Sequence, residues 1–231
     1  MLQAINLTKK YGKHVALSQL NLSIDKGEIF CLLGQNGAGK TTTINLFLGL
    51  IEPTSGEVLI NGIPVKPNNN KTTQMIAYIP EVVQLYGNLS GIDNLNFFSR
   101  LAGFRYANTE LSIFLSKAGL QETAHHKKLS SYSKGMRQKV GIAIALSKNA
   151  DYIFMDEPIS GLDPKAAIEF TKICKELSQD GTAIFMATHD IFNAVNVGTK
   201  IGIMKEGKLL HNTSTDSINA TELQNLYLKT I

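Results

Sequence analysis

The chain of 231 residues has no tryptophan, only two cysteines and only six prolines. Cys31 and Cys174 are too few for a disulfide framework and lack the spacing of metal ligands, which fits a reducing compartment. No stretch approaches the roughly 18 consecutive apolar residues of a membrane-spanning helix. The N-terminus alternates like a strand and lacks the regions of a secretory signal. We therefore expect a cytoplasmic protein without a membrane span of its own.

A basic cluster is also missing. The 23 Lys and Arg residues exceed the 19 Asp and Glu residues by four, but they are scattered along the chain. This charge pattern permits a nucleic-acid or membrane-surface partner but does not imply one, and we expect no nucleic-acid partner. The hydrophobic content of 43% is too high for a disordered chain and suffices for a substantial core. The length fits one domain that has room for separate lobes.

The order of the predicted elements indicates an α/β fold. Residues 2–7 and 14–24 alternate apolar and polar side chains, as half-buried antiparallel strands do. Residues 28–33, apolar from residue 29 onward, precede a helical pattern at 41–50, which is typical of a buried strand that leads into a helix. Further strands are predicted at 57–60, 75–79, 152–155, 182–187, 200–205 and 208–211, with a helix from Pro164 to about Gly181.

The middle of the chain follows a different pattern. The alternation disappears after about residue 85, and helical patterns cover 92–101, 109–118 and 134–148. We therefore expect one domain, 1–231, with a helical subdomain inserted at 83–149. The remaining parts, 1–82 and 150–231, are expected to form a catalytic core with an N-terminal antiparallel β subdomain.

A phosphate-binding loop is predicted where Gly34-Gln35-Asn36-Gly37-Ala38-Gly39-Lys40-Thr41 fits the pattern G-x-x-x-x-G-K-[ST]. The glycines allow successive backbone N–H groups to point into one concavity, and the following helix adds its positive N-terminal end. Lys40 would reach the β- and γ-phosphates, and the hydroxyl of Thr41 would bind Mg²⁺. The predicted nucleotide contacts are Gly34, Asn36, Gly37, Ala38, Gly39, Lys40, Thr41 and Thr42.

Two acidic residues follow the predicted strand at 152–155. Asp156 suits the Mg²⁺ shell, because carboxyl ends of parallel strands meet at the sheet edge where α/β proteins bind ligands. Glu157 could polarise the water that attacks the phosphate. Such a pair at a strand end is by itself more often a solvated turn. The phosphate loop elsewhere in the chain favours the catalytic interpretation.

With these motifs in this order, residues 2–210 resemble the nucleotide-binding subunit of ATP-binding-cassette (ABC) transporters. Tyr132-Ser133-Lys134-Gly135-Met136 resembles the family's signature, usually Leu-Ser-Gly-Gly-Gln, and keeps Ser133 and Gly135. The resemblance implies a P-loop NTPase core of the RecA-like type, with ATP and Mg²⁺ as cofactors. It also implies a dimer in which the helix N-terminus at Ser133 binds the γ-phosphate held by a second subunit.

The resemblance assigns roles to four more residues. Asp163 would help to arrange the partner's site, His189 would hydrogen-bond the γ-phosphate, and Tyr11 would stack on adenine. Taken singly, an exposed tyrosine or a lone histidine at a strand end needs no ligand. Glu81 stands where the family usually has glutamine, so it is expected near Mg²⁺ and the nucleotide. Unlike glutamine, it adds a negative charge and cannot donate a hydrogen bond. We expect slower hydrolysis or a different coupling to the membrane partner.

The implied function is that of an ATP-hydrolysing subunit that powers transport across a membrane, with export of drugs, peptides or lipids favoured over import. Lys40, Glu157 and His189 would be catalytic, and Thr41, Asp156 and Glu81 would surround the metal. The chain would lie on the cytoplasmic face of the cell membrane, bound to permease subunits on separate chains, and would pair with itself or with a second ABC subunit. Two alternatives stay open: a regulatory subunit that hardly hydrolyses ATP, and an ABC-type ATPase that acts on nucleic acid or ribosomes.

Overall fold

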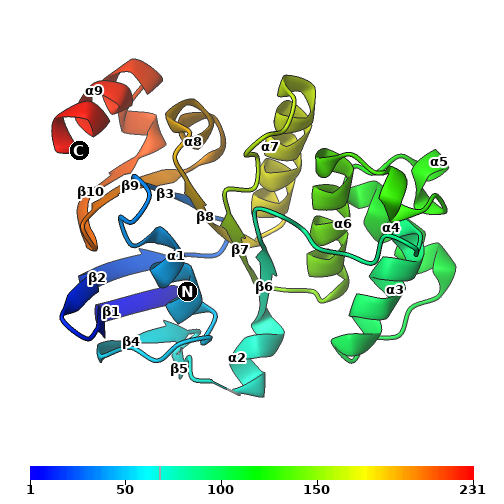
Figure 1. Ribbon diagram of the computed structural model, residues 1–231, viewed down its shortest axis with the longest axis horizontal. Helices are drawn as coiled ribbons and strands as arrows, with labels where there is room; N and C mark the ends of the chain where they lie inside the picture. The colour runs from blue at the N-terminus through cyan, green and yellow to red at the C-terminus, as the bar shows by residue number, and fades with distance from the viewer. Residues whose placement is uncertain (68) are drawn as a thin grey trace.

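The computed structural model describes residues 1–67 and 69–231 and contains two β-sheets with helices around them (Figure 1). The first sheet is antiparallel, with the strand order β2-β1-β4-β5. Its strands are β1 (Leu2–Tyr11), β2 (His14–Ile24), β4 (Ser55–Ile60) and β5 (Ile63–Pro64). This sheet confirms the antiparallel strands predicted near the N-terminus, and β1 is four residues longer than the predicted strand at 2–7.

The second sheet has the order β10-β9-β3-β8-β7-β6. Its neighbouring strands from β9 to β6 run parallel, and β10 pairs with β9 in the antiparallel direction. Its strands are β3 (Ile29–Leu33), β6 (Ile76–Ile79), β7 (Tyr152–Asp156), β8 (Ala183–Thr188), β9 (Lys200–Lys205) and β10 (Lys208–Ser214). The α/β fold predicted from the sequence is therefore confirmed.

The central strands β3 and β8 are buried along their whole length, because apolar layers cover both faces of the second sheet. Phe30 and Leu32 point to the side of the first sheet, and Ile29, Cys31 and Leu33 point to the opposite side. Helix α1 (Lys40–Phe47) packs against β2 of the first sheet and against β7 and β8 of the second. The apolar part of the predicted strand at 28–33, residues 29–33, is thus buried on both faces of the sheet.

The thiols of both cysteines lie in this interior. Burial raises the pKa of Cys31 to about 12 and also raises the pKa of Cys174. Neither thiol is a reactive thiolate at neutral pH. This agrees with the sequence, which offered neither residue a chemical role.

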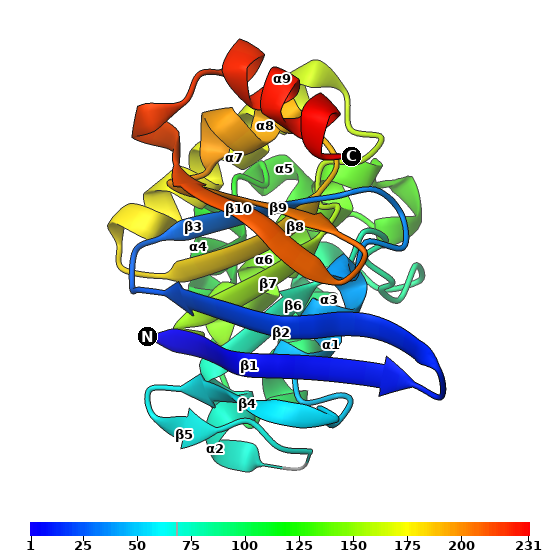
Figure 2. The same ribbon diagram turned by 90° about the vertical axis from the view of Figure 1, so that its left-hand side faces the viewer.

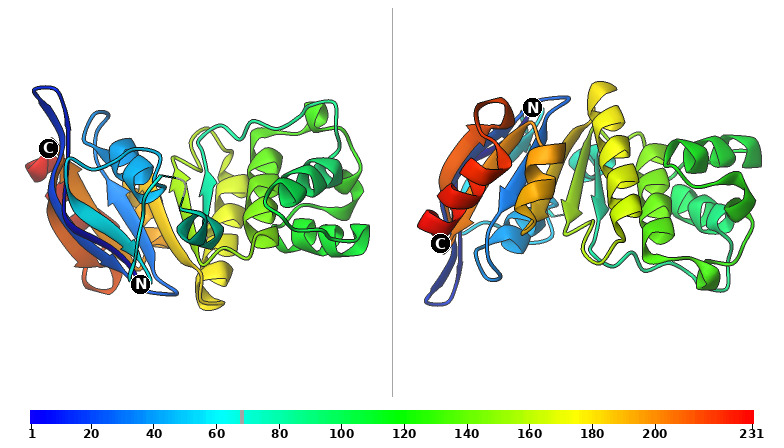
Figure 3. Two further views of the ribbon diagram at one scale, coloured as in Figure 1. Left: turned by 90° about the horizontal axis from the view of Figure 1, so that it is seen from below. Right: turned by 90° about the horizontal axis from the view of Figure 1, so that it is seen from above.

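Four helices gather at one end of the molecule, away from the N-terminal strands (Figure 3). They are α3 (Gly91–Leu101), α4 (Asn108–Lys117), α5 (Glu122–His125) and α6 (Lys134–Ser147), joined by a short 3₁₀ turn at Leu129–Ser131. Helices α3 and α4 both pack against α6. The helical patterns predicted at 92–101, 109–118 and 134–148 are confirmed, and the subdomain boundaries at 83 and 149 stay predictions.

The remaining helices surround the second sheet. Helix α7 (Pro164–Gln179) confirms the prediction made from Pro164. Four helices were not predicted from the sequence: α5, described above, and α2 (Asn70–Met75), α8 (Ile191–Val197) and α9 (Ala220–Thr230). Helix α9 packs against α8 and β9 near the C-terminus (Figure 2). Across residues 1–67 and 69–231, the structure has no helix that is both long and apolar enough to cross a membrane.

Candidate functional site: a nucleotide loop at the edge of the parallel sheet

The loop between β3 and α1 needs glycine at two crowded positions. Gly39 has φ 112°, and a Cβ atom there would lie 2.7 Å from the carbonyl oxygen of Ala16. A Cβ atom at Gly34 would lie 2.7 Å from the carbonyl oxygen of Met204. Both separations are shorter than van der Waals contact, so only glycine fits and the loop keeps its tight curve.

Lys40 points back into this loop. Its side chain is 7% exposed, and Nζ donates a hydrogen bond to the carbonyl oxygen of Gly34 at 2.6 Å. The same ammonium lies 3.7 Å from Oε1 of Glu157. A cavity of 270 Å³ adjoins the loop and is lined by Tyr11, His14, Ala16, Gln35, Asn36, Gly37, Gly39, Lys40, Thr41 and Thr42. The structure therefore brings Tyr11 and most of the predicted loop residues to one space, and Ala38 lines a neighbouring cavity with Asn36 and Gly37.

Thr41 and Asp156 meet although 115 positions separate them in the chain. Thr41 Oγ1 donates a hydrogen bond to Oδ2 of Asp156 at 3.1 Å. Burial raises the pKa of the Asp156 carboxyl, the Thr41 hydrogen bond lowers it, and the charge of Glu157 raises it further. A hydroxyl beside a carboxylate is a hard oxygen pair that suits Mg²⁺, whose other positions are usually filled by water and phosphate. The described residues contain no cluster of three acidic, histidine or cysteine side chains that would form an all-protein metal site.

Glu157 lies between the two other predicted catalytic side chains. Its Oε2 is 2.9 Å from Nδ1 of His189, and its Oε1 is the atom that faces Lys40. The Glu157 side chain is 14% exposed, whereas that of His189 is 64% exposed. The backbone of Glu157 has φ 46°, and its N–H donates to the carbonyl oxygen of Ala187 at 2.9 Å. The left-handed backbone turns the carboxylate out of β7 and toward Lys40 and His189.

The predicted signature residues occupy a helix N-terminus away from this cluster. Ser133 is the N-cap of α6, and its hydroxyl accepts a hydrogen bond from the N–H of Met136 at 3.3 Å. Gly135 is buried in the first turn of the same helix. Within the part of the chain that the structure describes, no hydrogen bond or ion pair joins Ser133 or Gly135 to Lys40. Their role in a composite site stays a prediction.

Asp163 is the N-cap of α7. Its Oδ1 accepts a hydrogen bond from the N–H of Ala166 at 2.9 Å, and Pro164 occupies the first helical turn. Asp163 makes this capping hydrogen bond within its own chain, without a second subunit. The predicted contribution of Asp163 to a partner's site is therefore an additional role that stays a prediction.

Glu81 does not contact Thr41 or Asp156 through a hydrogen bond; its Oε1 accepts one from Oγ of Ser160 at 3.0 Å. The side chain is 52% exposed, and Oε1 lies 4.0 Å from Nζ of Lys134. Its charge nevertheless raises the pKa of Asp156, which is consistent with a position in the same neighbourhood. The metal role of Glu81 stays a prediction.

The sequence analysis missed His14 beside the site and did not foresee the partner of Lys134. His14 lines the loop cavity opposite Tyr11, its direct partner across the β1–β2 hairpin. The two-residue turn Gly12-Lys13 between alternating strands is the signal that predicts this pairing. Lys134 departs from the signature and is expected from the sequence to add a charge near phosphate, but nothing local indicates that it lies near Glu81.

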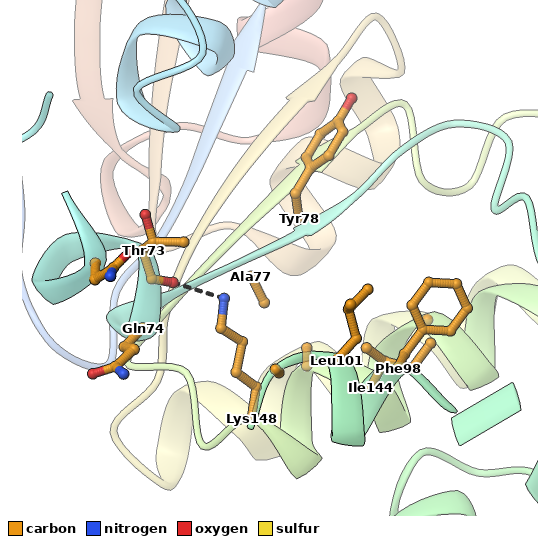
Figure 4. A pocket seen from close by; sticks show the side chains of 12 residues that line it. Thr73, Gln74, Ala77, Tyr78, Phe98, Leu101, Ile144 and Lys148 are labelled. Atoms are coloured by element: carbon orange, nitrogen blue, oxygen red, sulfur yellow. Dashed lines mark hydrogen bonds between the residues drawn. The ribbon is translucent and has the colours of Figure 1, made fainter. Parts of the chain in front are cut away.

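A second cavity, of 430 Å³, lies between α2, β6, α3 and α6 (Figure 4). Its floor is largely apolar, with Phe98, Leu101 and Ile144 on one side. On the other side, Nζ of Lys148 donates hydrogen bonds to the carbonyl oxygens of Thr73 and Ile76, both at 2.7 Å. Burial lowers the pKa of Lys148. This cavity is separate from the phosphate loop but borders the strand that leads to Glu81.

Fold and loop together define a P-loop α/β protein with a nucleotide site at the carboxyl edge of its parallel sheet. Comparison with known proteins gives the family: the model described as ABC transporter matches residues 17–160. The chain belongs to the ABC transporter family.

Relatives and solved structures agree with this assignment. The probable multidrug ABC transporter ATP-binding protein YbhF of Escherichia coli is 35% identical over 95% of this chain, which spans only 38% of the length of YbhF. The lantibiotic transport ATP-binding protein SrtF of Streptococcus pyogenes is 33% identical over 97% of this chain and 96% of its own length. The ATP-binding cassette MJ0796, solved as a dimer in a post-hydrolysis state with ADP and Pi, has a TM-score of 0.81 and is 29% identical over 93% of this chain and 99% of that one.

Proposed function

We propose that this chain binds ATP with Mg²⁺ and hydrolyses it to power the export of a substrate through separate permease subunits. The observation that carries the proposal is the assembly of Lys40, Glu157 and His189 at the mouth of the phosphate loop. The multidrug and lantibiotic transport named for YbhF and SrtF supports export. The chain acts in this proposal as a peripheral subunit on the cytoplasmic face of the membrane.

The proposed chemistry is phosphoryl transfer to water. The loop N–H groups and Lys40 bind the β- and γ-phosphates, and Lys40 exchanges its contact with Glu157 for phosphate oxygens. Thr41 and Asp156 would hold Mg²⁺, which neutralises charge on the phosphates when bound. Glu157 orients the attacking water and accepts its proton, and His189 donates a hydrogen bond to the γ-phosphate. The adenine stacks on the half-exposed ring of Tyr11.

A second subunit completes the site in this proposal. The first turn of α6, which is 14 residues long, presents free backbone N–H groups and the hydroxyl of Ser133 to a γ-phosphate on the partner. Gly135, where a Cβ atom would lie 3.2 Å from Cβ of Ala166, lets this turn pack closely against α7, and Asp163 adjoins the partner's loop. The dimeric form of MJ0796 supports this arrangement. The partner is a second copy of this chain or another ABC subunit.

The apolar cavity of Figure 4 is the proposed contact site for the permease. Large hydrophobic side chains are exposed around it: Leu101 is 74% exposed, Tyr86 48% and Phe97 42%. The rings of Tyr86 and Phe97 pack edge to face at 5.1 Å. An exposed cluster of this kind marks a protein-binding surface. A helix of a permease subunit could cover these side chains and thereby contact the segment that carries Glu81.

Lys40→Ala tests the nucleotide assignment directly. The substitution removes the side chain that neutralises the β- and γ-phosphates, so binding of ATP with Mg²⁺ should fall below detection in titration calorimetry and hydrolysis should stop. Lys172→Ala, on the exposed surface of α7, is the control and should bind as the wild type does. Unchanged affinity in Lys40→Ala would contradict the phosphate-loop assignment.

A further inference from the structure

Glu81, Lys134 and Ser160 form a cluster that joins three separate segments of the chain. Nζ of Lys134 donates a hydrogen bond to the carbonyl oxygen of Ser160 and lies 4.0 Å from Oε1 of Glu81. The same Oε1 accepts the hydroxyl hydrogen bond of Ser160 at 3.0 Å. The cluster therefore connects the segment after β6, the first residue of α6 and the turn that follows Glu157.

A neutral contact beneath the cluster holds two of these segments together. The buried side chain of Gln138, one turn further along α6, donates a hydrogen bond through Nε2 to the carbonyl oxygen of Glu81 at 3.1 Å. The backbone at Glu81 is thus fixed against α6. Its side chain is directed to Lys134 and Ser160, and its carboxylate makes no hydrogen bond to the Thr41–Asp156 pair.

Each of the two charges is unfavourable when it stands alone. Lys134 is the first residue of α6, where the helix dipole disfavours a cation. Glu81 adds a negative charge near Asp156 and Glu157, and its charge helps to raise the pKa of Asp156. Placed together, the ammonium and the carboxylate compensate for each other. Both positions depart from the signature and loop patterns that the chain otherwise resembles, and the two departures have opposite charge.

We propose that Glu81 is a positioning residue rather than a metal ligand: through Lys134 and Ser160 it aligns the start of α6 with the turn that carries Glu157. The inference rests on the proposed function, because in that function the start of α6 and the turn after Glu157 are the segments that meet nucleotide. It assigns Lys134, otherwise a departure from the signature, a defined role. The carboxylate acts through its charge and its hydrogen bond with Ser160, and neither requires Mg²⁺.

The test is a reciprocal charge exchange. Glu81→Lys and Lys134→Glu each place like charges together, and the double variant E81K/K134E restores the opposite pair in reverse order. We expect each single variant to lower the kcat for ATP hydrolysis about fivefold or more while the KM for ATP changes less than about twofold. The double variant should return to within about threefold of the wild-type kcat. A lysine at position 81 cannot bind Mg²⁺, so a metal-ligand role predicts no rescue.

A second measurement is independent of hydrolysis. Hydrogen–deuterium exchange of the nucleotide-free protein should increase over residues 78–86 and 133–142 in both single variants and return toward the wild-type level in the double variant. The exchange K172E/E176K, at the exposed i,i+4 ion pair of α7, is the matched control and should leave both measurements unchanged. Glu81→Gln keeps an acceptor for Ser160 without the charge, and should lower kcat less than Glu81→Lys.

The outcomes separate this inference from the proposed function. A wild-type protein without any ATPase activity would refute the proposed function, and the exchange measurement would still show whether the pair aligns α6. Single variants with unchanged protection, or a double variant that recovers neither protection nor kcat, would overturn the positioning role. Recovery of hydrogen-exchange protection without recovery of kcat in the double variant would also overturn the positioning role, because the Glu81–Lys134 pair would then be structural only. A rise in kcat in Glu81→Gln would also contradict it.

Discussion

Substitution of Glu157 by glutamine should separate ATP binding from hydrolysis. In the structure the Glu157 carboxylate lies 3.7 Å from the ammonium of Lys40, and both side chains are largely buried. In the proposed function this carboxylate competes with phosphate for Lys40. At an effective dielectric constant of about 20, two unit charges at that distance attract by about 4 kcal/mol. Desolvation and the remaining contact to His189 cancel most of this energy, so a net effect on the order of 1 kcal/mol is expected. The affinity of Glu157→Gln for ATP with Mg²⁺ should therefore rise about fivefold.

The rate of hydrolysis should change in the opposite direction. Glutamine keeps the shape and a hydrogen bond to His189 but cannot accept the proton of the attacking water, so the single-turnover rate should fall about 10²–10⁴-fold. ATP should then accumulate between two subunits and trap a dimer, detectable by light scattering. Glu169→Gln, which breaks the ion pair of Glu169 with Lys139 outside the site, is the matched control and should leave the single-turnover rate and ATP affinity unchanged. A Glu157→Gln protein that hydrolyses ATP at the wild-type rate would refute the role of Glu157.

Three further predictions concern other parts of the molecule. Ser133→Arg should leave ATP binding by one chain intact but abolish hydrolysis, and unchanged turnover would contradict the composite site. Burial raises the pKa of Asp156, so this group stabilises the fold below its ordinary value of 3.8 and that contribution is lost as the pH rises. Without nucleotide, Asp156→Asn should therefore have a higher Tm than the wild type at pH 7, and the difference in Tm should narrow toward pH 4. Addition of Mg²⁺ with ATP should no longer raise the Tm of this variant. An equal difference in Tm at both pH values would contradict the burial argument. The side chain of Leu101 is 74% exposed, and Leu101→Asp should lower reconstituted transport about tenfold or more without weakening ATP binding. The side chain of Ile168, on α7, is 71% exposed, and Ile168→Asp should have no effect. Equal transport by both variants would show that the cavity is not the permease contact.

The sheet and the loop could be predicted from the sequence because their signals are local. The apolar run at 29–33 followed by the glycine-rich motif specifies a buried strand, a tight turn and a helix within 20 residues. Helix α9 also had a local signal, since Asn219 and Glu222 form a capping box. The segment has no apolar strand pattern or glycine-rich motif beside that signal, and the sequence analysis did not predict the helix.

Other features had no local signal. Helix α2 is only six residues long and mostly polar, so it has no apolar periodicity to detect. The contact of Glu81 with Lys134 joins residues 53 positions apart, and depends on how α6 packs beside β6. The direction of the Glu81 side chain could not be read from its place in a motif, because the motif specifies a backbone position and not the partner that the tertiary fold supplies.

The left-handed backbone of Glu157 has a consequence for how this protein can change over generations. Glutamate at φ 46° is strained, and such strain costs about 1–3 kcal/mol. Asparagine and glycine adopt this conformation more easily, so Glu157→Asn and Glu157→Gly remove strain at the same step that removes the proposed base. A folded but inactive descendant is therefore one substitution away and loses little or no stability on the way. The proposed role in ATP turnover, and not the stability of the fold, is therefore what favours glutamate at this position.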